Sequence, residues 1–153
     1  MIITINLPVS KHLKEFLTTK FGKEYHLGTD NWFGVLISTL LERKSCWDFK
    51  PKKEEQNTEF YSIHIKLSYA NKHGIFLTKG HEELLRKSIE SLFRENIYEQ
   101  ALLNKECYGI DYKTTILNCL EYYGITDDNS NYLQALMRDF SRKKDRIETR
   151  RGE

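Results

Sequence analysis

Cationic side chains near the end of this 153-residue chain have the types and spacing that could do chemistry. Arg138, Arg142 and Arg146 recur every four residues, so a helix would carry them in one stripe, with Lys143 and Lys144 beside it. Guanidinium groups bind phosphates and guanine edges through paired hydrogen bonds. Closely spaced cations also gain affinity for a duplex by releasing its condensed counterions. We therefore expect these five residues to contact duplex DNA.

The net charge of the whole chain is too small to support that expectation by itself. The chain has 24 Lys and Arg against 22 Asp and Glu, a formal charge of +2 at pH 7. Positive charge is concentrated at residues 138–153, which contain seven basic and four acidic residues. The alternative is that these residues are the solvated end of a helix, where Lys and Arg complement the helix dipole.

Two amphipathic helices are predicted to position the stripe. The first ends at Gly124, and the second follows several capping side chains and carries apolar residues at i, i+3, i+4 and i+7. Their apolar residues are Tyr112, Ile116, Cys119, Leu120 and Tyr123, then Leu133, Leu136, Met137 and Phe140. We expect residues 110–146 to form a helix-turn-helix-like pair, or else an ordinary helical hairpin. A disordered basic tail is expected at 147–153.

The beginning of the chain predicts a strand at 2–7 and helices at 9–21 and 30–44. This order resembles the ribbon-helix-helix family of DNA-binding dimers, in which a paired two-stranded ribbon enters the major groove. The resemblance implies that Thr4 and Asn6 read bases. The connection after the first helix is longer than the short turn of that family. We favour the alternative that the strand joins a sheet of its own chain and that Thr4 and Asn6 face water.

A wider resemblance rests on motifs at both ends of the chain. These are the opening at 3–17 and the closing run Leu120-Glu121-Tyr122-Tyr123-Gly124-Ile125, followed by Leu133, Leu136 and Phe140-Ser141-Arg142-Lys143-Lys144. Together they resemble small uncharacterised proteins of bacterial phages and mobile elements. The resemblance implies an accessory or DNA-processing role in such an element, without an established activity.

The middle of the chain completes an α+β fold. Alternating residues predict a strand at 61–69, which turns back as a hairpin to 75–77. We expect a small antiparallel sheet from 2–7, 61–69 and 75–77, packed by the first two helices. The expected domains are a sheet domain at 1–78 with an exposed, flexible loop at 45–59, a long helix at 79–109 with a break near Asn96, and the helical pair at 110–146.

Catalytic and metal-binding patterns are absent from the sequence. It contains no His-x-x-x-His, no Cys-x-x-Cys and no glycine-rich phosphate-binding loop. We expect no enzyme activity, no cofactor, no metal and no small-molecule substrate. The three cysteines, Cys46, Cys107 and Cys119, indicate a reducing, cytoplasmic setting.

The sequence also leaves open what the protein binds. No apolar stretch approaches the roughly 18 residues that span a bilayer, so we expect no membrane partner. The alternative to DNA binding is a protein-interaction module, in which two copies associate along the helix at 79–106.

Overall fold

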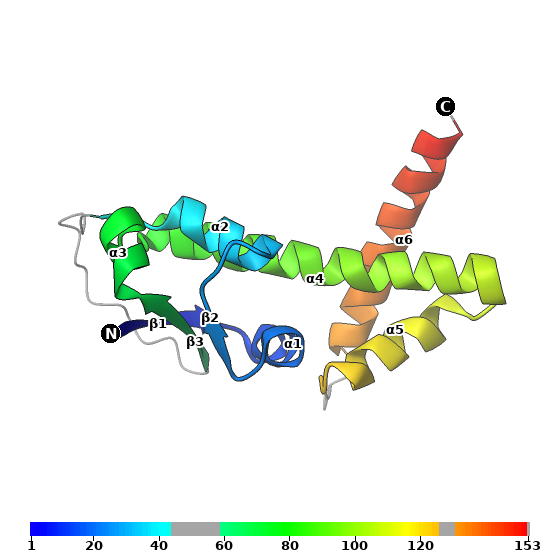
Figure 1. Ribbon diagram of the computed structural model, residues 1–153. Coiled ribbons are helices and arrows are strands. Elements are labelled where there is room, and N and C mark those ends of the chain that lie inside the picture. Colours follow the sequence, from blue (N-terminus) through cyan, green and yellow to red (C-terminus); the bar gives the residue numbers. More distant parts are fainter. Residues whose placement is uncertain (44–58, 126–130, 153) are drawn as a thin grey trace. The chain divides into compact units, whose positions relative to one another are not determined.

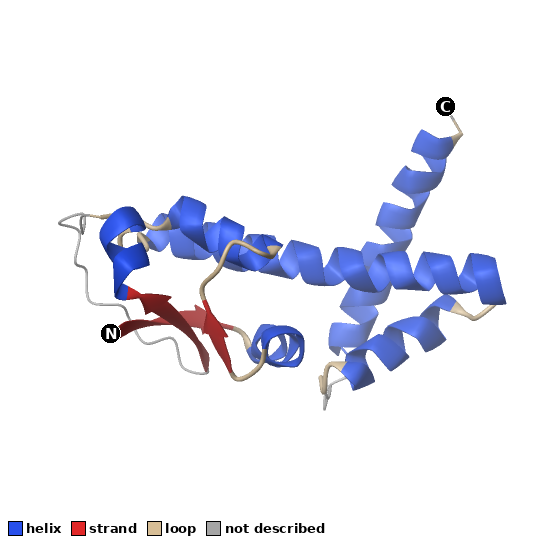
Figure 2. Cartoon of the chain, in the orientation of Figure 1, coloured by secondary structure: helices blue, strands red, loops and turns tan. Residues whose placement is uncertain are grey.

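The computed structural model describes residues 1–43, 59–125 and 131–152 and has an α+β architecture (Figures 1 and 2). Its elements, in chain order, are β1 (Ile2–Val9), α1 (Lys11–Phe21), β2 (Glu24–His26), α2 (Trp32–Leu40), β3 (Glu59–Lys66), α3 (Leu67–His73), α4 (Lys79–Tyr108), α5 (Tyr112–Tyr122) and α6 (Asn131–Arg151). Apart from residue 59, the loop expected at 45–59 lies outside the described residues.

The chain forms two compact units, residues 1–91 and 92–153. The long helix expected at 79–109 is therefore not a separate part. Residues of α4 up to Ser91 belong with the sheet, and those from Leu92 belong with α5 and α6. The helix is continuous at Asn96, where a break was expected.

The three strands of the first unit make a mixed sheet in the order β1-β3-β2. β1 pairs antiparallel with β3, from Ile2 opposite Lys66 to Val9 opposite Glu59. The prediction that the first strand joins a sheet of its own chain is therefore confirmed. Its edge position also accommodates Pro8, because an edge strand does not need an N–H for a neighbour on its outer side.

The prediction of a hairpin between strands at 61–69 and 75–77 is wrong. The β1–β3 ladder ends where the Leu67 N–H donates to the Met1 carbonyl, and the chain then turns into α3. Phe76 instead makes an isolated antiparallel bridge with Glu42. The third strand is β2, which pairs parallel with β3 and makes the sheet mixed rather than antiparallel.

The alternation along β3 separates a buried face of the sheet from a wetter one. Tyr61, Ile63 and Ile65 are buried, and Phe33 of α2 packs near them, with its ring centroid 6.3 Å from that of Tyr61. Apolar residues of α1 and of the first half of α4 complete this core: Leu13, Phe16, Leu17, Leu85 and Ile89. Burial of these side chains is the main stabilising contribution to the first unit.

Local hydrogen bonds fix where α2 and α4 begin. Asn31 caps α2, because its Oδ1 accepts a 3.0 Å hydrogen bond from the Gly34 N–H. Thr78 caps α4, since its Oγ1 accepts a hydrogen bond from the His81 N–H at 3.1 Å.

A series of apolar residues every four positions along α4 is buried within the chain. These residues are Leu85, Ile89, Phe93, Ile97 and Ala101. Among the described residues of α4, the large hydrophobic side chains that remain exposed are Leu84, Leu103 and Tyr108. A homodimer along the whole helix would therefore lack a continuous apolar stripe, because the chain covers that stripe itself.

The second unit packs the rest of α4 against α5 and α6. The Phe140 ring lies between two tyrosines, 5.4 Å from Tyr98 and 5.0 Å from Tyr112. α6 continues to Arg151, so residues 147–151 are helical rather than a disordered tail. The turn predicted between α5 and α6 falls mainly on residues 126–130, outside the described residues, and the helix-turn-helix geometry stays a prediction.

Candidate nucleic-acid interface

Three arginines form an exposed line along α6, on the side away from its buried face. Leu136 and Phe140 are buried, whereas Arg138, Arg142 and Arg146 are exposed. Successive residues of a helix are about 100° apart, so Arg142 projects about 160° away from Phe140. At 1.5 Å per residue, the three arginines extend over about 12 Å. We call these three residues the arginine line.

The two lysines of the predicted site lie apart from the arginine line. The Lys143 ammonium lies 5.3 Å from the centroid of the Tyr98 ring and 3.4 Å from Asp139 Oδ2. The Lys144 ammonium lies 4.8 Å from the centroid of the Tyr112 ring and 3.6 Å from Glu148 Oε1. Both cations therefore already have partners in the second unit, and their contacts join α6 to neighbouring helices.

Within the described residues, Asp139 lies within ion-pair distance of the arginine line, and several donors share its charge. Its Oδ2 accepts hydrogen bonds from Tyr98 at 2.7 Å and from Arg94 at 3.1 Å. Burial opposes its ionisation, but the hydrogen bonds from Tyr98 and Arg94 and the charge of Lys143 outweigh burial and lower the pKa of Asp139.

The carboxylate of Asp139 therefore does little to neutralise the arginine line. The distance from Arg142 Nη2 to Asp139 Oδ1 is 3.9 Å, and the Arg142 side chain stays 74% exposed. Across residues 1–43, 59–125 and 131–152, no ion pair involves Arg138 or Arg146. Three guanidinium groups are thus available for an external anion.

Three residues outside the predicted site also bear on this surface. Arg150 is exposed one turn beyond Arg146 and extends the arginine line, and the four-residue spacing of the arginines could have indicated it. Arg94 and Tyr98 hold Asp139 from α4. Their contacts join residues about 40 positions apart, and no local spacing indicates such a pairing.

Thr4 and Asn6, the positions implied by the ribbon-helix-helix resemblance, are exposed on the wetter face of the sheet. Thr4 Oγ1 lies 2.9 Å from His64 Nδ1, and Ser62 donates a 3.2 Å hydrogen bond to Asn6 Oδ1. Both side chains therefore take part in polar contacts across β1 and β3. Their role in reading bases stays a prediction.

His64 is the centre of a second group of polar side chains on that face. Its ring stacks on His26 with centroids 5.2 Å apart, and its Nε2 lies 3.0 Å from Glu24 Oε2. A hydroxyl, an imidazole and a carboxylate in this order are groups that nucleophilic catalysts use. However, Glu24 is 60% exposed, and His64 Nε2 makes no hydrogen bond of normal geometry to the described residues. The contact between His64 and Glu24 therefore meets the distance for an ion pair but lacks the hydrogen bond that would orient the imidazole of a catalytic group.

Neither similarity to known proteins nor another kind of site assigns a function to this chain. No protein-family model, no curated protein and no solved structure matches this chain. Within the described part of the chain, no three His, Cys, Asp or Glu side chains are grouped as metal ligands. In the same part, no helix has the length and apolar character needed to cross a bilayer.

Proposed function

We propose that this protein is a non-enzymatic DNA-binding accessory or regulatory protein that contacts duplex DNA through the arginine line of α6. The single observation that supports this is the exposure of Arg138, Arg142 and Arg146 along one side of a helix. The cytoplasmic location and the mobile-element context belong to the same proposal, and they rest on the cysteines and on the sequence resemblance.

The arginine line suits the backbone of a duplex. A duplex carries one charge per roughly 1.7 Å of axis when both strands are counted, so a length of about 12 Å of duplex contains about seven phosphates, more than three arginines need. Contacts of this kind position a protein on DNA without selecting a sequence. The proposed activity is therefore sequence-tolerant binding, with Lys143 and Lys144 supporting the helix that presents the arginines.

A binding measurement with charge-matched variants tests the proposal. Arg142→Gln/Arg146→Gln removes two charges from the arginine line. Lys11→Gln/Lys72→Gln removes two charges from exposed positions in the first unit. In fluorescence anisotropy with a short random-sequence duplex, the first variant should lose roughly tenfold to hundredfold in affinity, because two phosphate contacts are lost. The second should bind like the unmodified protein. Equal losses in both variants, or no detectable binding by the unmodified protein, would refute the proposal.

A further inference from the structure

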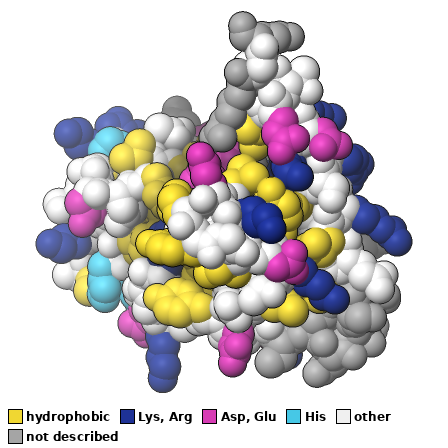
Figure 3. All heavy atoms as spheres, turned by 90° about the vertical axis from the view of Figure 1, so that its right-hand side faces the viewer, with side chains coloured by type: hydrophobic (Ala, Val, Ile, Leu, Met, Phe, Trp, Pro, Cys, Tyr) yellow, Lys and Arg dark blue, Asp and Glu magenta, His cyan; other side chains and the backbone are white. Residues whose placement is uncertain are grey.

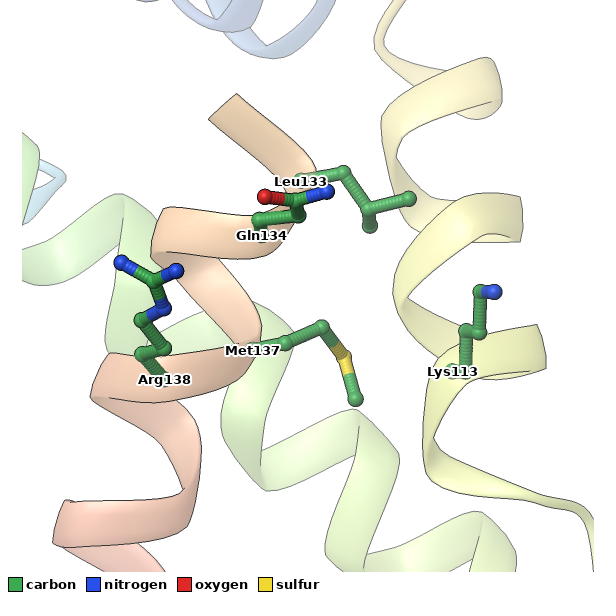
Figure 4. A pocket seen from close by; sticks show the side chains of 5 residues that line it. All are labelled: Lys113, Leu133, Gln134, Met137 and Arg138. Carbon is green, nitrogen blue, oxygen red and sulfur yellow. The ribbon is translucent and has the colours of Figure 1, made fainter. Parts of the chain in front are cut away.

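A groove between α5 and α6 provides a second surface in the second unit. It has a volume of about 390 Å³ and is lined by Lys113, Leu133, Gln134, Met137 and Arg138. Figure 4 shows Leu133 and Met137 pointing from α6 toward α5, where Lys113 lies on the facing side. The surface that these five residues expose to the groove is almost entirely apolar, and none of the five is acidic. The groove therefore suits an apolar side chain flanked by carboxylates.

An exposed face of α4 has the complementary chemistry. Leu103 is 52% exposed, although it is a large aliphatic residue. Glu99 and Glu106, four residues before it and three after it, are also exposed. On a helix these spacings place all three side chains on one face. Figure 3, viewed from the side on which α4 ends, shows exposed hydrophobic side chains with acidic and basic side chains around them.

We propose that two copies of this chain associate by inserting Leu103 of one copy into the α5–α6 groove of the other. The leucine side chain fills the apolar groove, and Glu99 and Glu106 supply negative charge for Lys113 and Arg138. Desolvation of Leu103 gives most of the affinity, and the charges set the orientation. This contact differs from pairing along the whole of α4, and it does not depend on the proposed DNA binding.

Other occupants fit the groove less well. A nucleobase is held mainly by stacking on aromatic rings, and none of the five lining residues is aromatic. The groove has room for one or two side chains, so the interface is small. Self-association should therefore be weak, with a dissociation constant on the order of 0.1–1 mM.

Sedimentation equilibrium of the full chain, without nucleic acid, tests the proposal. The unmodified protein should associate as its concentration rises. Leu103→Glu should weaken association more than about tenfold, because an apolar anchor at the centre of an interface is replaced by a charge. Leu84→Glu is the matched control, since Leu84 lies on the same helix, is 50% exposed and belongs to the first unit. It should leave association unchanged.

A charge reversal tests whether the α5–α6 groove is the surface that receives Leu103. Lys113→Glu should also weaken association, and adding Glu99→Lys or Glu106→Lys to that variant should restore it. Lys113 and Leu103 are exposed, so these variants should keep the fold, which circular dichroism checks. Absence of association near 1 mM, equal effects of the two leucine variants, or no rescue by either reversal would overturn the proposal.

Discussion

The Tyr98 hydroxyl donates a 2.7 Å hydrogen bond to Asp139, and this contact joins α4 to α6. Arg94 adds a second donor from one turn earlier on α4, and Lys143 adds a charge from α6 itself. Together these groups hold one buried side of α6. The arginine line on the other side is therefore presented by a helix that is fixed by its own packing.

The Asp139 contacts predict an acid-dependent loss of stability. The pKa of Asp139 is lowered in the folded chain, so its contribution is present above its unfolded pKa of about 3.9 and is lost as the pH falls through the folded value. Asp139→Asn should lower the free energy of unfolding by about 2 kcal/mol at pH 7. The difference from the unmodified protein should shrink toward pH 3, as measured by urea unfolding. A difference that does not change with pH would contradict this account.

Gly34 is predicted to tolerate no side chain. A Cβ at this position would lie 1.7 Å from the Gly28 carbonyl oxygen and 2.6 Å from the Tyr25 hydroxyl. Gly34→Ala should therefore destabilise the first unit by about 3 kcal/mol, because backbone must move. Gly80→Ala is the control: nothing lies within 4 Å of its Cβ position, and alanine favours helix by about 0.5–1 kcal/mol. Thermal unfolding that ranks these two variants the other way would show that the packing of α2 differs from this structure.

Tyr61 should make the protein sensitive to alkali. Burial raises the pKa of Tyr61 to about 12, and its hydroxyl donates a 2.8 Å hydrogen bond to the Gly22 carbonyl. The unfolded chain releases this proton near pH 10, so the contribution is present below pH 10 and is lost as the pH rises toward about 12. Urea unfolding should show that the stability difference between the unmodified protein and Tyr61→Phe narrows over this range. A stability difference that stays constant up to about pH 12 would contradict the raised pKa of the buried Tyr61 hydroxyl.

The wetter face of the sheet, which carries Thr4 and Asn6, is predicted to be dispensable for duplex binding. Thr4 and Asn6 take part in contacts with His64 and Ser62 of their own chain. Thr4→Ala/Asn6→Ala should therefore leave duplex affinity within about twofold, since no base contact is lost, and should cost about 1 kcal/mol or less in stability. A large drop in affinity in the anisotropy assay would instead favour the base-reading role that the ribbon-helix-helix resemblance implies.

Much of the fold could be predicted where the pattern is local. The alternation at 61–69 overlaps β3, and the helix expected at 79–109 matches α4 closely, because both patterns are local in the sequence. The three residues of β2 were predicted as a connection, because pairing with β3 brings together residues 38 positions apart, such as Tyr25 and Ile63. The alternation of apolar and polar residues also continues to Tyr69, although the pairing of β3 with β1 ends at Lys66.

The candidate site shows the same division between local and distant information. The spacing of Arg138, Arg142 and Arg146 predicts their common side of α6. Adjacent positions in the sequence suggested that Lys143 and Lys144 act with them. The rings that hold those two lysines belong to Tyr98 and Tyr112 on other helices, so their separation from the arginine line depends on tertiary packing.

The salt dependence of duplex binding tests the central claim most directly. A plot of log affinity against log salt should be steep for the unmodified protein. It should flatten by about 0.9 for each arginine removed in Arg142→Gln, Arg142→Gln/Arg146→Gln and Arg138→Gln/Arg142→Gln/Arg146→Gln, because each makes a phosphate contact. Lys11→Gln/Lys72→Gln should keep the original slope. A slope that is the same in all of these variants would contradict the account.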